Sequence, residues 1–138
     1  MLATGGAGFI GANFVLDWLG QSNEAIINLD ILTYAGNLEN LTALAADERH
    51  TFVHGNIGDS TLVSNLLARY QPRAIINFAA ESHVDRSILG TEEFIQTNIV
   101  RTFRLLEAGR ASWNAINAKA KQMLRVRHVC RYDVDVSL

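Results

Sequence analysis

The chain has 138 residues, of which 49% are apolar and 19% are charged, so it has the composition of one globular domain and not of a disordered segment. A net charge of −2 offers no electrostatic attraction for nucleic acid or an acidic membrane, and no apolar run approaches the ~20 residues of a membrane span. The single cysteine, Cys130, allows no internal disulfide, and no leader of basic and then apolar residues opens the chain. We therefore expect a cytoplasmic protein without nucleic-acid or membrane partners.

A glycine-rich turn, TGGAGFIG at residues 4–11, follows a short strand expected at Met1–Thr4. Its spacing allows a tight turn from strand to helix, a close approach of the backbone to a diphosphate, and close packing of the following helix. The diphosphate would meet unpaired N–H groups at the positive end of that helix. The glycines that satisfy this spacing are Gly5, Gly6, Gly8 and Gly11, and the helix is expected to carry Ile10, Phe14, Trp18 and Leu19 on one face.

The next expected strand, Ala25–Asp30, ends in a carboxylate nineteen residues after Gly11. A carboxylate at this distance from a glycine-rich turn is typical of a residue that binds the ribose hydroxyls of a dinucleotide. It would repel a 2′-phosphate, and the neighbouring Ile31 supplies no arginine in compensation, so the sequence predicts NAD as the preferred cofactor over NADP.

The remaining pattern alternates between helices and strands. It predicts a helix over Asn37–Ala46, a strand over Thr51–His54, a helix that begins at Asp59 or Ser60 and ends near Pro72, an apolar strand over Ala74–Ala80, a long helix over about Thr91–Ser112 and a fifth strand over Arg125–Val134. This alternation predicts an α/β fold with a Rossmann-type doubly wound parallel sheet, strand order 3-2-1-4-5 and a ligand crevice at the carboxyl ends of the strands.

Two pairs of residues near the third strand allow more than one interpretation. His50 and His54 would chelate a metal from a helix, but the residues between them favour a strand, so we expect no metal site. Asn56 and Ile57 follow this strand, where an adenine edge could lie, and a plain loop explains them equally well.

Two later segments are also ambiguous. The sequence ESHVDRS at residues 81–87 groups polar side chains after the fourth strand, either in the ligand crevice or in a solvated loop. The apolar stripe of Ile95, Ile99, Phe103 and Leu106 is expected in the core or in a subunit interface.

Four segments together resemble the dTDP-glucose 4,6-dehydratases, nucleotide-sugar members of the extended short-chain dehydrogenase/reductase family: residues 4–11 (TGGAGFIG), 28–41 (NLDILTYAGNLENL), 78–88 (FAAESHVDRSI) and 94–108 (FIQTNIVRTFRLLEA). The likeness covers about residues 2–129. It implies NAD as the cofactor, dTDP-glucose as the substrate, a homodimer in the full-length family, and oxidation at sugar carbon 4 followed by loss of water and return of the hydride at carbon 6.

The resemblance also implies roles for individual positions. Cofactor contacts are implied for Gly5, Gly8, Ile10, Gly11, Asp30, Thr33, Asn56, Ile57, Phe78, Ala79, Ala80, Ser82 and Thr97. Contacts with the sugar substrate are implied for Ser82, His83, Asp85 and Arg86.

The chain departs from the family after Val129, where Ser-Thr-Asp-Glu-Val-Tyr-Gly is replaced by CRYDVDV at residues 130–136. Arg131 replaces a sugar-binding hydroxyl, and Tyr132, a phenol with an ordinary pKa of about 10, replaces the general acid. Only Asp133 keeps a carboxylate, so it is the one catalytic candidate. Arg101 and Gly109 also stand where the family has Gly and Ala.

We therefore expect residues 1–138 to form an NAD-binding Rossmann domain that is truncated before the substrate domain and diverges over residues 125–138. The 138 residues contain no Tyr-x-x-x-Lys pair, which serves the oxidation in the family. Three hypotheses compete: the cofactor-binding part of a dehydratase, an NAD-binding fragment without catalysis, and another nucleotide-sugar enzyme such as a 4-epimerase. The TYAGN and ESHVDRS segments argue against the last.

Overall fold

Five parallel strands form a single sheet in the computed structural model, which describes residues 1–80, 92, 95–115 and 125–129. The order β3-β2-β1-β4-β5 confirms the predicted topology, in which the chain crosses from one side of β1 to the other. The strands are β1 (Leu2–Thr4), β2 (Ile26–Asp30), β3 (His50–His54), β4 (Ala74–Asn77) and β5 (Arg125–His128).

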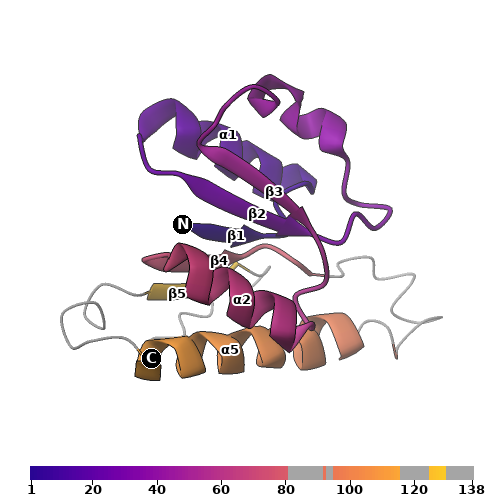
Figure 1. The fold of residues 1–138 in the computed structure, drawn as a ribbon. Coiled ribbons are helices and arrows are strands. Elements are labelled where there is room, and N and C mark those ends of the chain that lie inside the picture. Colours follow the sequence, from indigo (N-terminus) through magenta and orange to yellow (C-terminus); the bar gives the residue numbers. More distant parts are fainter. Residues whose placement is uncertain (81–91, 93–94, 116–124, 130–138) are drawn as a thin grey trace.

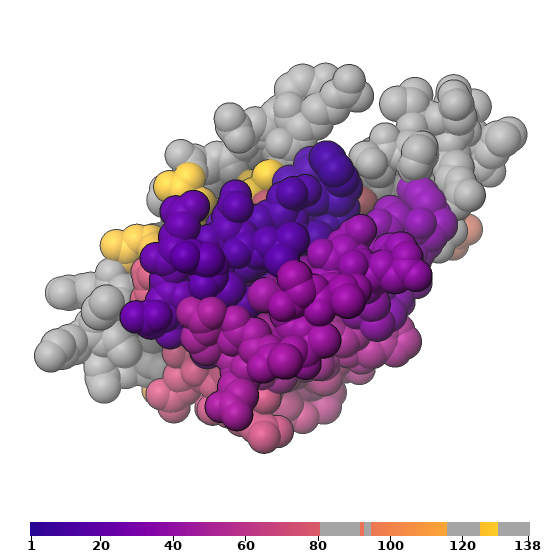
Figure 2. Space-filling view, turned by 90° about the horizontal axis from the view of Figure 1, so that it is seen from above, coloured from indigo at the N-terminus to yellow at the C-terminus, as the bar shows by residue number. Residues whose placement is uncertain are grey.

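Helices cover both faces of the sheet (Figure 1). On one face, α1 (Phe9–Gln21) and the 3₁₀ helix η1 (Leu38–Leu44) enclose a core built on Ala3, Val15 and Ile26. Figure 2 views the molecule from this side, where the indigo and purple N-terminal residues form a continuous layer. On the other face, α2 (Ser60–Tyr70) and α5 (Thr102–Ala115) pack over a second core that includes Leu2, Leu67 and Leu105. The π-helix η2 (Gln96–Arg101) leads directly into α5. The doubly wound arrangement is thus present in the described residues.

Helix α1 buries most of its predicted apolar face: Leu19 is buried, and Phe14 and Trp18 pack against the core. Gly11, Ala12 and Val15 are buried as well, whereas the predicted Ile10 is 65% exposed. Ile10 lies at the second position of the helix, where the chain has just left the turn, so its side chain points away from the sheet although its spacing fits the apolar pattern.

The helix predicted over Asn37–Ala46 is present as a 3₁₀ helix over Leu38–Leu44. Asn37 caps it, because its side-chain oxygen accepts a hydrogen bond from the Glu39 N–H at 2.9 Å. With three residues per turn, Leu41 and Leu44 fall on the same buried side. The α2 helix matches its prediction, with Asp59 as the capping residue.

The fourth strand ends earlier than predicted, at Asn77, and residues 78–80 leave the sheet. The side chain of Asn77 causes this, because its Oδ1 accepts the Ala79 N–H at 3.1 Å and so replaces a ladder partner. The fifth strand ends at His128 and Val129 is not part of it, while residues 130–134 of the predicted strand lie outside the described residues.

The predicted long helix contains a π-helical turn, η2, before α5 begins at Thr102. In the described structure Ile95, Ile99 and Phe103 are 43%, 60% and 59% exposed, so the prediction of a place in the core is wrong for them, while the alternative of a subunit interface stays a prediction. Leu106 alone packs against the core.

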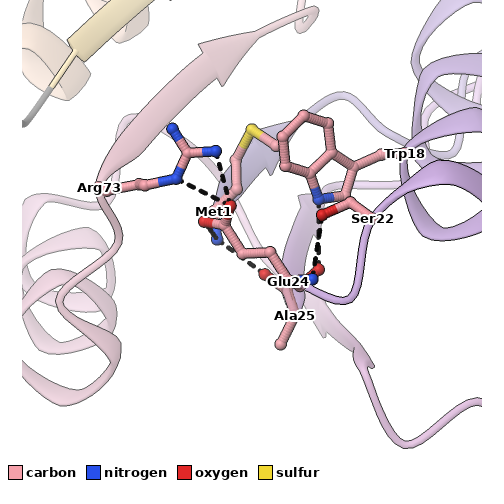
Figure 3. Close-up of polar contacts among 6 residues, drawn as sticks. All are labelled: Met1, Trp18, Ser22, Glu24, Ala25 and Arg73. Atoms are coloured by element: carbon pink, nitrogen blue, oxygen red, sulfur yellow. Dashed lines mark hydrogen bonds and ion pairs between the residues drawn. The ribbon is translucent and has the colours of Figure 1, made fainter.

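The amino ends of the strands are held by a cluster of polar contacts around Glu24 (Figure 3). Arg73 binds the Glu24 carboxylate at 2.7 Å, and the Met1 amino group lies 3.4 Å from its other oxygen. Burial raises the pKa of Glu24, but the hydrogen bonds from these two cations outweigh it and hold the pKa below its ordinary value. This cluster ties β1, β2 and β4 together at the edge opposite the site described below. None of the helices among the described residues has the length and apolarity needed to cross a membrane.

Candidate functional site

A pocket of about 680 Å³, including space open to solvent, lies at the carboxyl ends of the strands. It occupies the place where the strand order reverses, the usual ligand site of such sheets. Its lining includes ten positions with an implied cofactor contact: Gly5, Gly8, Asp30, Thr33, Asn56, Ile57, Phe78, Ala79, Ala80 and Thr97.

The glycine-rich turn is packed too tightly for side chains against backbone at Gly5 and Gly11, and a Cβ on Gly6 would overlap the Asn28 side chain. Gly5 has φ +71°, and a Cβ there would lie 2.5 Å from the Ala79 backbone nitrogen. A Cβ on Gly11 would lie 2.8 Å from the Cα of Gly6 and would overlap the Gly5 carbonyl oxygen. Gly5 therefore permits the turn and Gly11 permits α1 to pack on it.

Helix α1 begins at the pocket without a side-chain cap. Gly8 is its N-cap in an extended conformation, and its carbonyl accepts the Ala12 N–H at 2.8 Å. The amides of Phe9, Ile10 and Gly11 precede the first bond of the helix, so they lie at the positive end of the helix dipole. Gly8 lines the pocket, whereas Ile10 and Gly11 lie in the first turn of α1 outside its lining.

Asp30, which is predicted to bind the ribose of a dinucleotide, also has a structural role. Its carboxylate accepts the Ala7 N–H and the Leu32 N–H, each at 2.8 Å, and the residue is only 6% exposed. These bonds tie the glycine turn to the loop after β2, in which Leu32 has φ 55°. The same carboxylate lines the pocket, so it is placed both to hold the turn and to meet a ligand.

The loop after β3 forms the outer end of the pocket. Asn56 Oδ1 accepts the Gly58 N–H at 2.8 Å, and Ile57 is buried in the core. Asn56 therefore serves the loop as a turn residue while it lines the pocket, and both of its sequence interpretations fit this position.

A chain of hydrogen bonds crosses the sheet beneath the other wall. Thr4 Oγ1 donates to Asn77 Oδ1 at 2.5 Å, and Asn77 Nδ2 lies 2.9 Å from His128 Nδ1. Since Asn77 Oδ1 also accepts the Ala79 N–H, its amide nitrogen faces the imidazole, and neutral His128 carries its proton on Nε2. Burial lowers the pKa of His128. The network fixes the backbone of the pocket wall at Ala79.

Several lining residues were not predicted from sequence: Leu29, Ile31, Ala35, Gly36, Gly55 and Arg101. Most of them neighbour the ends of β2 and β3, and their nearness to Asp30 and Asn56 is the signal that could have identified them. Arg101 carried only the signal of its departure from the family pattern. The predicted residues Ser82, His83, Asp85, Arg86 and Asp133 lie outside the described residues.

His50 and His54 occupy the two ends of β3, and His54 Nε2 lies 3.1 Å from the Ile31 carbonyl oxygen. Within the described residues, no group of three or more His, Cys, Asp or Glu side chains is placed to hold a metal.

Comparison with known proteins relates this chain to nucleotide-sugar dehydratases. The family model for GDP-mannose 4,6 dehydratase matches residues 2–127. A dTDP-glucose 4,6-dehydratase of Xanthomonas campestris is 53% identical over 133 residues, which cover 96% of this chain and 38% of that protein. This chain thus spans well under half the length of its curated relatives.

Solved structures give the same result. A dTDP-glucose 4,6-dehydratase from Streptomyces venezuelae with NAD bound matches with a TM-score of 0.81 and 44% identity, over 92% of this chain and 38% of that one. A UDP-glucose 4-epimerase from Brucella ovis in complex with NAD has a TM-score of 0.74 at 28% identity, over 92% of this chain and 34% of that one. These findings confirm the resemblance predicted from the sequence. The match of the family model over residues 2–127 shows that the chain belongs to the GDP-mannose 4,6-dehydratase family.

Proposed function

We propose that this chain is the NAD-binding part of a dTDP-glucose 4,6-dehydratase. The observation that carries the proposal is the pocket at the sheet's switch point, where the glycine turn, the start of α1 and Asp30 converge. Relatives at up to 53% identity bear this enzyme's name, and a structural neighbour at 44% identity holds NAD.

The residues present fit NAD. Gly5 and Gly11 leave the backbone of the turn bare, and the uncapped amides of α1 offer donors to a diphosphate. Asp30 and Thr33 would hold the adenosine ribose, Asn56 and Ile57 would border the adenine, and Phe78, Ala79, Ala80 and Thr97 would line the nicotinamide side. Bound there, NAD supplies reversible acceptance of a hydride.

NAD is the expected form because Asp30 is buried with its charge held by two backbone donors. A 2′-phosphate beside this carboxylate would meet a like charge in a partly desolvated site. Calorimetric titration of the 138-residue protein with NAD and NADP tests this preference. We expect saturable 1:1 binding of NAD with NADP weaker by tenfold or more, that is, by at least about 1.4 kcal/mol. Tighter binding of NADP would refute the preference.

Catalysis is assigned to the whole enzyme and not to these residues alone. Ser82, His83, Asp85 and Arg86 are proposed to contact the sugar, and Asp133 is the remaining carboxylate candidate. Because Tyr132 stands at the general-acid position and the 138 residues hold no Tyr-x-x-x-Lys pair, the isolated chain should bind NAD without converting dTDP-glucose. Purified protein, expressed in a host that lacks the enzyme, tests this by product chromatography, and a 4-keto-6-deoxy product would refute it.

A further inference from the structure

Arg101 is the basic residue in the lining of the pocket, and Asp30 is the acidic one. It is the last residue of η2, and its Nη1 donates to Thr97 Oγ1 at 3.1 Å. Its aliphatic stem packs on Gly58, since a Cβ on that glycine would lie 2.9 Å from the Arg101 Cγ. The stem of Arg101 is therefore held at Gly58 and its guanidinium at Thr97.

The contact with Gly58 places Arg101 at one end of the pocket. Gly58 directly follows Asn56 and Ile57 in the loop after β3, which is the outermost strand on this side of the sheet. Asp30 is the last residue of β2, and the glycine turn follows β1. A dinucleotide with its diphosphate at α1 and a ribose at Asp30 extends its purine beyond β2 toward β3. The Arg101 stem thus borders the purine end, and its guanidinium extends from there along the pocket wall toward Thr97.

The other side chains at the purine end of the pocket are apolar or already hydrogen-bonded within the protein. Ile57 is buried, and Asn56 Oδ1 is taken by the Gly58 N–H. A guanidinium is planar, always charged and weakly hydrated, and it packs readily on the face of an aromatic ring. Purine faces are recognised by arginine planes in the same way.

We propose that Arg101 contacts the adenine base and raises the affinity of this pocket for adenosine-containing ligands. The inference deepens the proposed function and rests on it. The family pattern has a glycine at this position, so the contact is a property of this chain's own sequence.

Arg104 supplies a matched control. Its Nη1 donates to the Gly58 carbonyl at 3.2 Å, so both arginines reach the same loop, but Arg104 does not line the pocket. The experiment compares Arg101→Met, which keeps an aliphatic stem, Arg101→Lys, which keeps the charge without the plane, and Arg104→Met. Each is titrated by calorimetry with NAD, ADP-ribose and adenosine, and its thermal midpoint is recorded.

We expect Arg101→Met to decrease the affinities for NAD, ADP-ribose and adenosine by a common factor of about five to ten, which is the effect of losing one partly desolvated cation–π contact. Arg101→Lys should lose about half of that free energy, and Arg104→Met should bind like the wild type. Should Arg101→Met fail to fold, the affinities of Arg101→Lys for the same three ligands test the inference.

Equal affinities of wild type and Arg101→Met would overturn the inference while leaving the proposed function intact. A loss confined to ligands with a diphosphate, with adenosine unaffected, would also overturn it, because the arginine would then act on phosphate. A wild-type chain that binds neither NAD nor adenosine would overturn both proposals.

Discussion

Replacing Asp30 by asparagine should destabilise the chain before any ligand is added. The two carboxylate oxygens accept the Ala7 and Leu32 N–H groups at 2.8 Å in a residue that is 6% exposed. Asparagine keeps one acceptor and turns an NH₂ group toward the other donor, so one buried N–H loses its partner. Hydrogen bonds to charged groups contribute about 1.5–3 kcal/mol, and the lower desolvation cost of an amide offsets part of the loss.

The expected net loss is about 2 kcal/mol, which corresponds to a decrease of roughly 6–8 °C in the thermal midpoint of a domain of this size. Asp59→Asn makes the same chemical change at an exposed helix cap, where one oxygen accepts the Leu62 N–H at 3.0 Å. Asparagine caps as well as aspartate, so that variant should change stability by less than about 0.5 kcal/mol. Calorimetric melting of both variants checks the reasoning. Equal thermal midpoints of Asp30→Asn and Asp59→Asn would show that the Asp30 carboxylate does not hold the glycine turn.

Three further results are expected. Gln71 ends α2 with φ 42°, so Gln71→Gly should stabilise the chain by roughly 0.5–1 kcal/mol in urea unfolding, and Gln71→Ala should give no gain. Burial lowers the pKa of His128, and it lowers the pKa of His50 despite the opposing effect of Asp47. The unfolded chain therefore binds more protons than the folded chain below about pH 6.5, and the urea midpoint of unfolding should decrease between pH 7 and pH 5.5. An unchanged or higher midpoint at pH 5.5 would contradict this assignment. The exposed Ile99 and Phe103 should drive concentration-dependent association in light scattering, which the double serine variant should abolish; a wild-type chain that stays monomeric at high concentration would count against this surface.

The strand order and the glycine turn could be predicted because local rules determine them. Alternating helices and strands restrict the topology, and the positive φ of Gly5 and the tight packing at Gly11 are requirements that only glycine meets at low cost. The position of Asp30 follows from the same spacing. Its bonds to two backbone amides could not be predicted, because they depend on how the next loop folds back.

Other features depend on contacts distant in sequence. The end of β4 is set by the side chain of Asn77, whose partners Thr4 and His128 lie on neighbouring strands. A periodic pattern cannot reveal the π-turn before α5, because it assumes a constant number of residues per turn. The stem of Arg101 lies on Gly58, which is forty-three residues away, and this contact cannot be read from a local pattern.

Chemical-shift mapping of the isotopically labelled 138-residue protein during titration with NAD tests the central claim most directly. We expect saturable amide shifts concentrated at Gly5–Gly11, Asp30–Gly36, Gly55–Gly58 and Phe78–Ala80, with little change around Glu24 at the opposite edge of the sheet. Absence of saturable shifts, or shifts centred on the Glu24 edge, would contradict the assignment of the pocket as an NAD site.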